Sequence, residues 1–544
     1  MARTFEGQGG RERRPKLPVL AAATLVAGLA LGAYEAAAEK RGGILRLYNS
    51  TNPPSGSILE ESTIATINPF SAVFNNLVYY DQTKAINSAD NIIPELAESW
   101  SYDASRTKLT FKLRKGVKWH DGKPFTAKDV QCTMNFLTEK DGKKRFRRNP
   151  RKSWFETVKE TTVDNDHQVT LHLTRPQVSL LPMLASGQLP VYPCHVSARD
   201  MRIKPVGTGP FAFVSFKGNQ SITFKRNPNY WRKGYPLLDG IEWKIVRNRS
   251  TRLLAFKAGE FDFTTVADVT APLLPGVQST PGVTCGLAHT NAPYNVIIND
   301  KRAPFDNVKV RKAAALAIDR AAFIKILTLN KGEVGAWMLP SPEGHWSLPP
   351  EEVAKLPGYG KDVEKNRAEA RKLMASLGYG PDKPLAIKVS TRSFTAYRDA
   401  ATLLVGQLNR VYFKAELEVV ESSVWFGRLA RQDFLIGLNL SGVAIDDPDV
   451  TLGGAFACKS NVNRTKYCNP KVDDLLIKQS QEADPTKRKQ IVWEIERIVA
   501  NDGVRPLLYH NRSATCWRNH VKGYVHQLNS LYNNWRFERV WLDK

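Results

Sequence analysis

The sequence has few cysteines and lacks the residue patterns that hold metals or catalyse hydrolysis. Six cysteines occur in 544 residues, without a Cys-x-x-Cys pair or a Cys/His cluster of zinc spacing. The nine histidines are dispersed, which argues against a metal site. No Gly-x-Ser-x-Gly turn or His-Glu-x-x-His helix is present. The sequence therefore favours a protein that is not an enzyme and has no cofactor or metal.

No apolar run long enough to span a bilayer follows residue 38, and the one long apolar stretch lies near the start. A basic segment at 11–16 precedes the apolar residues 17–33, and 36–38 offers the small side chains that a signal peptidase needs. A membrane anchor is the alternative, but 17 residues rich in Ala and Gly are short for one. The first cysteine is Cys132, which argues against a lipid anchor. We expect residues 1–38 to be a cleaved signal peptide.

Cysteines in an exported chain are expected to form disulfides. Cys458 and Cys468 bracket a short polar loop and are the best pair on sequence grounds. The sequence alone leaves the pairing of the other four open: Cys132, Cys194, Cys285 and Cys516.

The chain is strongly basic, with a formal charge of +25, of which the expected mature part keeps +23. Such a charge occurs in nucleic-acid-binding proteins, but export and the dispersal of the basic residues argue against that function. The one dense basic run is KKRFRRNPRK, residues 143–152. We interpret it as a solvated loop, with a docking surface for an anionic partner as the alternative.

His120 and Asp121 stand side by side and could begin an active site. The preceding residues 109–114 alternate as in a strand, and Thr126 with Asp129 forms a capping box that starts a helix. A catalytic triad needs a third group and an oxyanion site, and the sequence offers neither. A structural role for His120 is favoured, and an exported hydrolase remains an alternative.

From about residue 290 the pattern changes to alternating strands and longer helices, which is typical of βαβ units. An Ala-rich helix is predicted over 308–329, capped by Asp306 or Asn307. Two more helices are predicted to begin at Pro470 and Pro485, each after a capping residue.

Several stretches in one order resemble the large substrate-binding proteins of ABC importers of extracellular family 5, which handle peptides and nickel. The resemblance covers residues 42–526. The stretches are PELAESW (94–100), KLRKGVKWHDGKPFTAKDV (112–130), GTGPF (207–211), RNPNYW (226–231), 310–320, Asp447-Pro448 and YCNP (467–470).

The resemblance implies an α/β fold of the two-lobed periplasmic-binding-protein type, with an extra sub-domain in lobe I and two crossover strands. Lobe I would comprise residues 39–286 and 514–544, and lobe II residues 287–513. Cys285 and Cys516 would then lie near the crossovers and pair, which leaves Cys132 to Cys194.

The implied function is a periplasmic receptor that captures a peptide or peptide-like solute by hinge closure. It would deliver the solute to ABC permease subunits in the inner membrane, served by cytoplasmic ATPases, and would act as a monomer without nucleic acid. An opine, a sugar or a metal chelate are alternative solutes.

In the peptide receptors of this family, an aspartate four residues before the proline of the Asp-Pro motif binds the ligand's ammonium group. Here that position is Ala444, which puts binding of a free amino terminus in doubt. Trp425 is interpreted as a stacking platform or a core residue, and Arg392 as a ligand contact or a surface residue. The candidate ligand contacts are Ser50, Ser62, Thr63, Arg392, Trp425, Asn439, Ser441, Gly442, Asp446 and Asp447.

Overall fold

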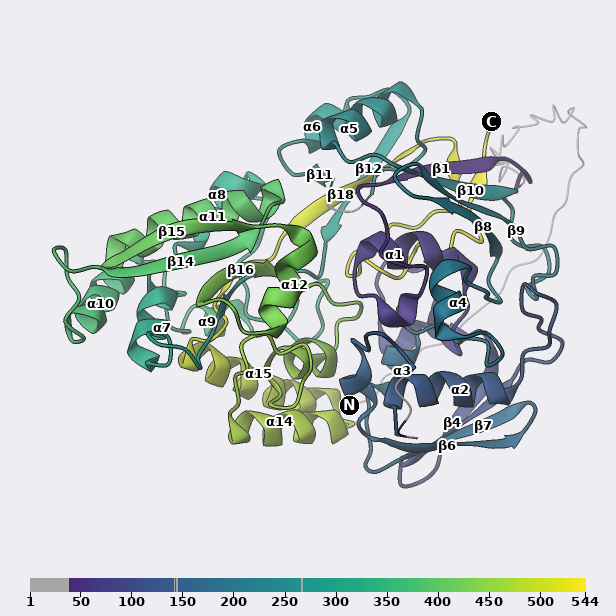
Figure 1. Cartoon of the computed structure of the whole chain (residues 1–544), viewed down its shortest axis with the longest axis horizontal. Helices are drawn as coiled ribbons and strands as arrows, with labels where there is room; N and C mark the ends of the chain where they lie inside the picture. Colours follow the sequence, from purple (N-terminus) through teal and green to yellow (C-terminus); the bar gives the residue numbers. More distant parts are fainter. Residues whose placement is uncertain (1–38, 141, 143–144, 266–267) are drawn as a thin grey trace, which may run out of the picture. The chain divides into compact units, whose positions relative to one another are not determined.

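The computed structural model describes residues 39–140, 142, 145–265 and 268–544. The helices and strands in Figure 1 all belong to one compact unit, residues 40–544. The expected signal peptide, residues 1–38, lies outside the described residues. Within the described ranges, no helix has the length and apolar character needed to cross a membrane.

The first lobe is built around two four-stranded sheets that share one large apolar core. One sheet has the order β1-β10-β9-β8, with β1 parallel to β10, and the other has the order β4-β5-β7-β6. The strands are β1 (Ile44–Asn49), β10 (Gly240–Ile245), β9 (Ser221–Arg226), β8 (Phe211–Lys217), β4 (Ala97–Tyr102), β5 (Lys108–Leu113), β7 (Gln168–Leu173) and β6 (Val158–Asn165).

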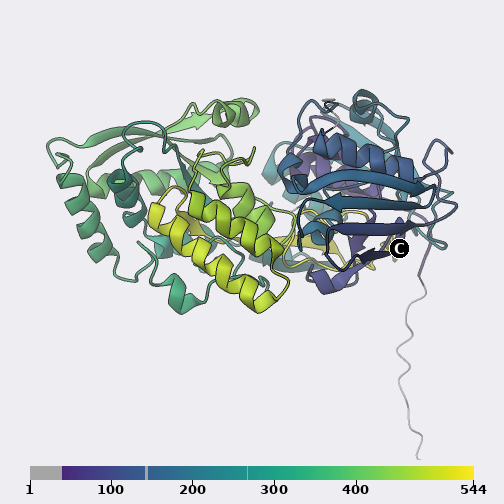
Figure 2. The same cartoon turned by 90° about the horizontal axis from the view of Figure 1, so that it is seen from below.

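Helix α2 (Ala127–Thr138) packs on the sheet that contains β6 and β7, as Figure 2 shows. The Asp129 carboxylate accepts from the Thr126 N–H at 2.9 Å, so the predicted capping box starts this helix. The first lobe also contains α1 (Ile64–Phe70), β2 (Val78–Tyr80), β3 (Ile92–Pro94), α2 (Ala127–Thr138), α3 (Leu180–Leu184), α4 (Ala198–Ile203), α5 (Arg249–Ala258), α6 (Leu274–Gln278), β19 (Val521–Lys522) and β20 (Trp541–Leu542).

The second lobe surrounds a five-stranded sheet of order β15-β14-β16-β13-β17. Its parallel pairs, β14 with β15 and with β16, are connected through helices, and α11 contacts all three strands. The strands are β13 (Tyr294–Ile298), β14 (Leu385–Arg392), β15 (Phe413–Val420), β16 (Ile436–Leu440) and β17 (Leu507–Tyr509). The helices are α7 (Val308–Leu316), α8 (Arg320–Thr328), α9 (Pro350–Val353), α10 (Val363–Ala375), α11 (Thr395–Leu408), α12 (Ser422–Ala430), α13 (Gly454–Phe456), α14 (Pro470–Gln481) and α15 (Pro485–Asp502).

A three-stranded sheet of order β11-β18-β12 carries the two predicted crossovers. β12 (Val283–His289) pairs antiparallel with β18 (Arg512–Arg518), and β11 is Val269–Thr270. The predicted lobe boundaries fall within β12 and β18, and they stay a prediction.

The structure contains three disulfides, and each joins two cysteines that the sequence analysis assigned to each other. Cys285 and Cys516 face each other directly in the β12–β18 pair. The other two are Cys132–Cys194 and Cys458–Cys468.

The helix predicted over 308–329 is two helices, so this prediction was wrong. α7 ends at Leu316 and α8 begins at Arg320. Asp319 between them has an extended backbone, and its carboxylate accepts from the Ala322 N–H at 2.9 Å. A capping residue inside the apolar pattern therefore restarts the helix.

The basic run at 143–152 is not simply a solvated loop, because its described part binds the segment before α1. Arg151 is 2 % exposed and donates to the backbone carbonyls of Ile58, Leu59 and Glu61 at 2.8 to 3.3 Å. Burial lowers the pKa of Arg151 to about 10. Arg148 pairs with the Glu61 carboxylate from a half-exposed position. The basic run therefore stabilises the backbone conformation of residues 58–61.

Replacement of Arg151 by Met should destabilise the protein by about 3 kcal/mol, because three buried carbonyls each lose a hydrogen bond from the guanidinium. Arg148→Met should cost less, about 1 kcal/mol, because Arg148 is half-exposed and the buried Glu61 keeps its bonds from Arg147 and Ser55. Urea denaturation of both variants checks this. Equal losses would contradict the role assigned to Arg151.

Candidate functional site

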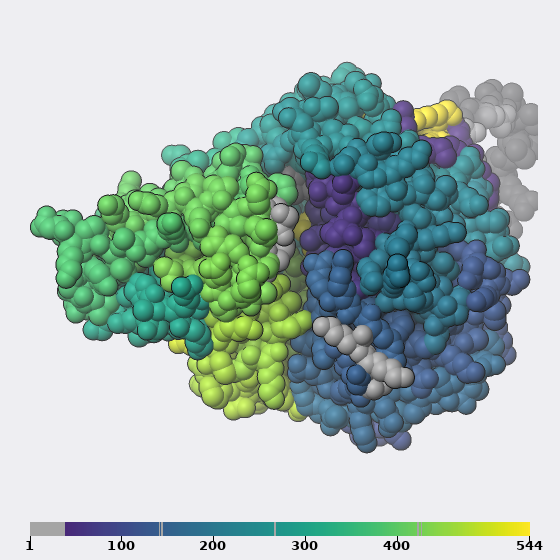
Figure 3. Space-filling model, in the orientation of Figure 1, coloured from purple at the N-terminus to yellow at the C-terminus, as the bar shows by residue number. Residues whose placement is uncertain are grey.

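A groove separates the two lobes on the face shown in Figure 3, where the surface is hollowed between the purple and the green parts of the chain. On the first-lobe side, Ser62 and Thr63 precede α1, and Thr63 is its N-terminal capping position. Tyr532 lies beside them, with its hydroxyl 3.5 Å from the Ser62 carbonyl oxygen. Two predicted contact residues thus meet a tyrosine from the C-terminal tail.

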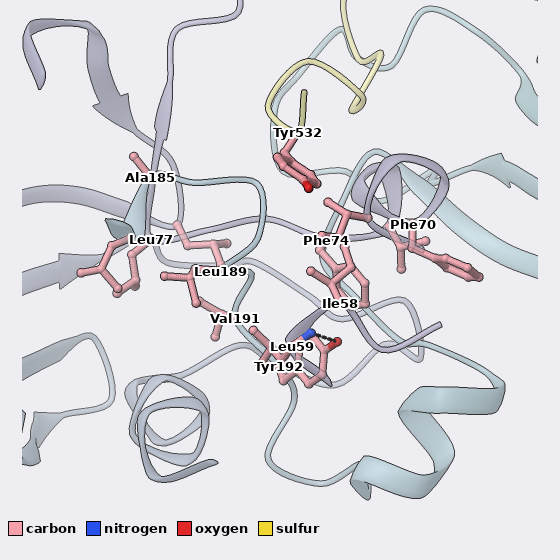
Figure 4. Close-up of a cluster of buried hydrophobic side chains, with 14 of the residues drawn as sticks. Ile58, Leu59, Phe70, Phe74, Leu77, Ala185, Leu189, Val191, Tyr192 and Tyr532 are labelled. Carbon is pink, nitrogen blue, oxygen red and sulfur yellow. Dashed lines mark hydrogen bonds between the residues drawn. The ribbon is translucent and has the colours of Figure 1, made fainter. Parts of the chain in front are cut away.

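The first-lobe wall is held rigidly from behind. Residues Ile58–Glu60 form a buried turn, and Tyr192 Oη accepts from the Leu59 N–H at 3.2 Å (Figure 4). Figure 4 also shows Tyr532 pointing toward Phe74 in the same apolar cluster. The Ser62–Thr63 segment therefore extends from a packed core.

Gly442, on the second-lobe side, lies opposite Tyr532. A Cβ atom on this exposed glycine would lie 3.3 Å from Tyr532 Oη and 3.5 Å from the Ala292 Cβ. The lack of a side chain lets the segment after β16 approach the first lobe closely. Ser62, Thr63 and Gly442, all predicted contacts, therefore come together around Tyr532.

Arg392 ends β14 on the same second-lobe wall. Its guanidinium lies 4.7 Å from the Phe394 ring centroid and 5.1 Å from that of Tyr397, and Nη1 donates to Tyr397 Oη at 3.3 Å. Burial raises the pKa of Tyr532 to about 12, and nearby Tyr397 adds to the rise. Tyr397 thus connects Arg392 with the neighbourhood of Tyr532, and a cation between aromatic faces is suited to a polar solute.

Trp425 is a core residue and offers no surface to a ligand. Its side chain is 1 % exposed and packs with Ile297 and Phe434. The indole Nε1–H donates to Asn439 Oδ1 at 3.4 Å. The interpretation as a stacking platform is thus corrected, because α12 buries this ring against the sheet and uses it to orient Asn439.

Asp447 is occupied by a buried ion pair and is not free to bind a ligand. Arg488 Nη1 and Nη2 donate to its two carboxylate oxygens at 3.0 and 2.9 Å. Both side chains are about 6 % exposed. Ala444, at the position of the family's ammonium-binding aspartate, is fully buried, and its carbonyl accepts from Ser530 and Asn533.

Asp446 is likewise held by the protein. Its Oδ2 accepts from the His345 N–H at 2.7 Å, and its backbone carbonyl accepts from Trp346 Nε1. Burial raises the pKa of this carboxyl to about 7, and the Asp447 charge adds to the rise. A carboxyl that is often protonated is a poor partner for an ammonium group.

Ser50 stands apart from the other candidates. It follows β1, and its N–H donates to Asn49 Oδ1 at 3.0 Å. Its described contacts connect it neither to Tyr532 nor to the segment after β16.

His120 and Asp121 do not form a catalytic pair. The Gly207 N–H donates to His120 Nδ1 at 3.3 Å, so Nε2 carries the proton and donates to the Gly209 carbonyl at 2.9 Å. Burial lowers the pKa of His120 to about 4. Asp121 instead contacts His195 Nε2 at 2.6 Å. Both ring nitrogens of His120 are used, which agrees with the structural role favoured from sequence.

Sequence reasoning missed Tyr397 and Tyr532 beside the groove, and it missed Asn295 and Arg505, which are buried behind Ser441. Arg505 directly precedes Pro506 and the buried strand β17, and a charged residue at the start of a buried strand was an available signal. Tyr532 lies in an aromatic-rich tail that gave no signal for its position.

The lobes also touch beside the groove. Asn461, in the loop closed by Cys458–Cys468, donates to the Asn149 carbonyl at 2.9 Å, and Ser153 donates to its amide oxygen at 3.3 Å. The Val178 N–H donates to the Ser480 carbonyl at 2.9 Å, and Ser179 bonds the Asp449 carboxylate. These polar contacts lie beside an apolar contact between the lobes, because Ala444, Ile445 and Val450 pack in the same core cluster as the first-lobe residues.

Asp446→Asn should change how stability depends on pH. The pKa of Asp446 is about 7 in the folded state and 3.8 in its ordinary state. At pH values between these two, the folded state therefore binds more protons than the unfolded state. The free energy of unfolding of the wild type, relative to Asp446→Asn, should therefore fall as pH rises from about 4 to 7. Urea denaturation across this range checks it.

Asp382→Asn, which removes an exposed carboxylate, is the matched control for the loss of one acidic group. A difference between wild type and Asp446→Asn that stays constant with pH would contradict the prediction.

Comparison with known proteins places the chain in a family. The profile described as "Bacterial extracellular solute-binding proteins, family 5 Middle" matches residues 91–463. The chain is 25 % identical to the "Probable di/tripeptide-binding protein 5" of Pseudomonas aeruginosa, over 88 % of this chain and 92 % of that protein.

Two solved structures show the same fold. The periplasmic binding protein DppA of Helicobacter pylori, in complex with the peptide STSA, matches with a TM-score of 0.80 at 21 % identity, covering 93 % of this chain and 99 % of that one. MoaA of A. tumefaciens R10, in complex with mannopinic acid, matches with a TM-score of 0.80 at 21 % identity, covering 93 % and 100 %. The predicted α/β fold of the two-lobed periplasmic-binding-protein type is thus confirmed, and the chain belongs to the bacterial extracellular solute-binding proteins of family 5.

Proposed function

We propose that this chain is the substrate-binding receptor of an ABC importer and captures a peptide or peptide-like solute between its lobes. The observation that carries the proposal is the meeting of Ser62 and Tyr532 with Gly442 across one groove. Family membership and relatives named for peptide binding support it. The wall combines aromatic rings with a few polar groups, which suits a small solute.

The mechanism is hinge closure about β12 and β18, with lobe I at 39–286 plus 514–544 and lobe II at 287–513. The ligand can shift the equilibrium toward the closed state only by the difference between its binding free energies for the closed and the open state. The polar contacts of Asn461 and Ser179 across the lobes would form on closure and break on release. Ala444 and Ile445 would stay packed against the first lobe near the hinge, where Ser530 and Asn533 donate to the Ala444 carbonyl.

The same proposal includes export by the signal peptide and action in the periplasm as a monomer. The closed receptor would dock on inner-membrane permease subunits, and cytoplasmic ATPases would drive transport. The site that we describe is a binding site and not a catalytic one.

An opine or another solute without a free ammonium group is the second candidate. Ala444 replaces the aspartate expected for an ammonium group, and Arg488 already occupies Asp447. A solved relative in complex with mannopinic acid agrees with this alternative.

A thermal-shift screen of peptides, opines and sugars tests the proposal on protein purified without refolding. One class should raise the melting temperature, since ligand at a hundred times its Kd stabilises by about 2.7 kcal/mol. Calorimetric titration of the hit should show saturable one-to-one binding. The absence of a shift from every class would overturn the proposal.

Arg392→Ala should weaken binding of that hit by roughly tenfold or more, because a charge-assisted contact at the wall is lost. Arg398→Ala, an exposed arginine on α11, is the matched control and should leave affinity unchanged. Equal affinities of both variants would exclude Arg392 from the site.

A further inference from the structure

Ser441 follows β16 beside Gly442 and is half-buried at the groove. Its Oγ accepts from Arg505 Nη2 at 2.7 Å, from Asn295 Nδ2 at 3.1 Å and, at the limit of a hydrogen bond, from Asn439 Nδ2 at 3.5 Å. A hydroxyl has two lone pairs and one proton. The surrounding donors therefore use the lone pairs, and the proton is left to donate elsewhere.

The amide orientations around Ser441 are fixed by other bonds. Asn295 Nδ2 also donates to the carbonyls of Pro293 and Asn439, and its Oδ1 accepts from Arg505 Nη2 at 3.2 Å. Asn439 Oδ1 accepts from Trp425, which directs Nδ2 toward Ser441. Each neighbour thus presents a donor, and within the described contacts Ser441 Oγ donates no bond.

Arg505 places a positive charge directly behind this hydroxyl. The residue is 4 % exposed, and its guanidinium stacks 4.6 Å from the Trp337 ring centroid. Among the described ion pairs, none joins Arg505 to a carboxylate, and its Nε is buried without a partner. Arg464 lies close enough to add a second positive charge, and burial, with this neighbour, lowers the pKa of Arg505 to about 9.

The nearest acidic side chains of the segment after β16 do not cancel this charge. Arg488 neutralises Asp447, and Asp446 is bound by the His345 N–H. The end of β16 therefore presents a hydroxyl donor backed by an unneutralised guanidinium, which favours an anion over an ammonium group.

We propose that Ser441 binds a carboxylate of the solute through its hydroxyl proton, and that Arg505 is the positioning residue that orients and polarises this hydroxyl. The inference rests on the proposed receptor function and names its substrate class, an acid recognised at the second-lobe wall. The carboxylate could be a peptide C-terminus or the acid group of an opine, because both offer the same acceptor.

Matched pairs of acid and primary amide test this with wild-type protein. The probes are the tetrapeptide Ser-Thr-Ser-Ala and mannopinic acid, each with its carboxylate free or amidated, measured by calorimetry and thermal shift. One acid should bind at least tenfold tighter than its amide, since hydrogen bonds to charged groups are the stronger ones. The probe that binds identifies which source supplies the carboxylate.

Ser441→Ala should reduce affinity for the acid by roughly tenfold or more and leave the amide nearly unchanged, so that the preference disappears. Ser376→Ala, an exposed serine at the end of α10, is the matched control and should keep the preference. Arg505→Met should reduce the acid preference in the same way, and Arg505→Lys should retain part of it. Melting curves verify that each variant is folded.

Two results would overturn the inference and are distinguishable from each other. If wild-type protein binds only solutes without a carboxylate, or binds acid and amide equally, the receptor function stands and the role of Ser441 is wrong. If wild-type protein binds neither probe nor any peptide, opine or sugar of the wider screen, the receptor function fails and this inference fails with it.

Discussion

The antiparallel pairing of β12 with β18 is the constraint on which the site depends. These strands lie far apart in the sequence, yet Cys285 and Cys516 face each other in their register and are joined by a disulfide. In the sequence, the groove residues of the first lobe lie before β12 or after β18, and those of the second lobe lie between these strands. Tyr532 returns to the first lobe after β18, so it meets Ser62 only because the chain crosses back. The same pairing allows the walls to move while their own cores stay packed.

A second theme is the internal use of positive charge in a basic chain. Arg151 binds the carbonyls before α1, Arg488 holds Asp447, and Arg505 lies behind Ser441. Guanidinium groups suit such positions because their five donors reach several acceptors at once. The formal charge of +25 therefore does not by itself indicate an anionic macromolecular partner. Part of that charge organises the groove.

Local signals in the sequence predicted local structure well. The capping box at Thr126 and the helix starts at Pro470 and Pro485 all occur as expected. The prediction of one helix over 308–329 failed in part because the Asp319 N–H donates to Gln407 Oε1, which lies on a helix distant in sequence. The same limit explains the site: whether Trp425 or Asp447 faces a ligand depends on partners that are remote in sequence. Family resemblance located the right segments, but only packing decides which side chains face the groove.

The loop between Cys458 and Cys468 has a consequence for the rate of capture. Its Asn461 touches the opposite lobe, and the disulfide restricts the loop in the open and closed states alike. A free loop would lose conformational entropy each time the lobes met, roughly 1 to 2 kcal/mol for every residue ordered. A loop that is already shaped avoids most of this loss. The contact can then form quickly and break quickly, as a protein that must release its cargo requires.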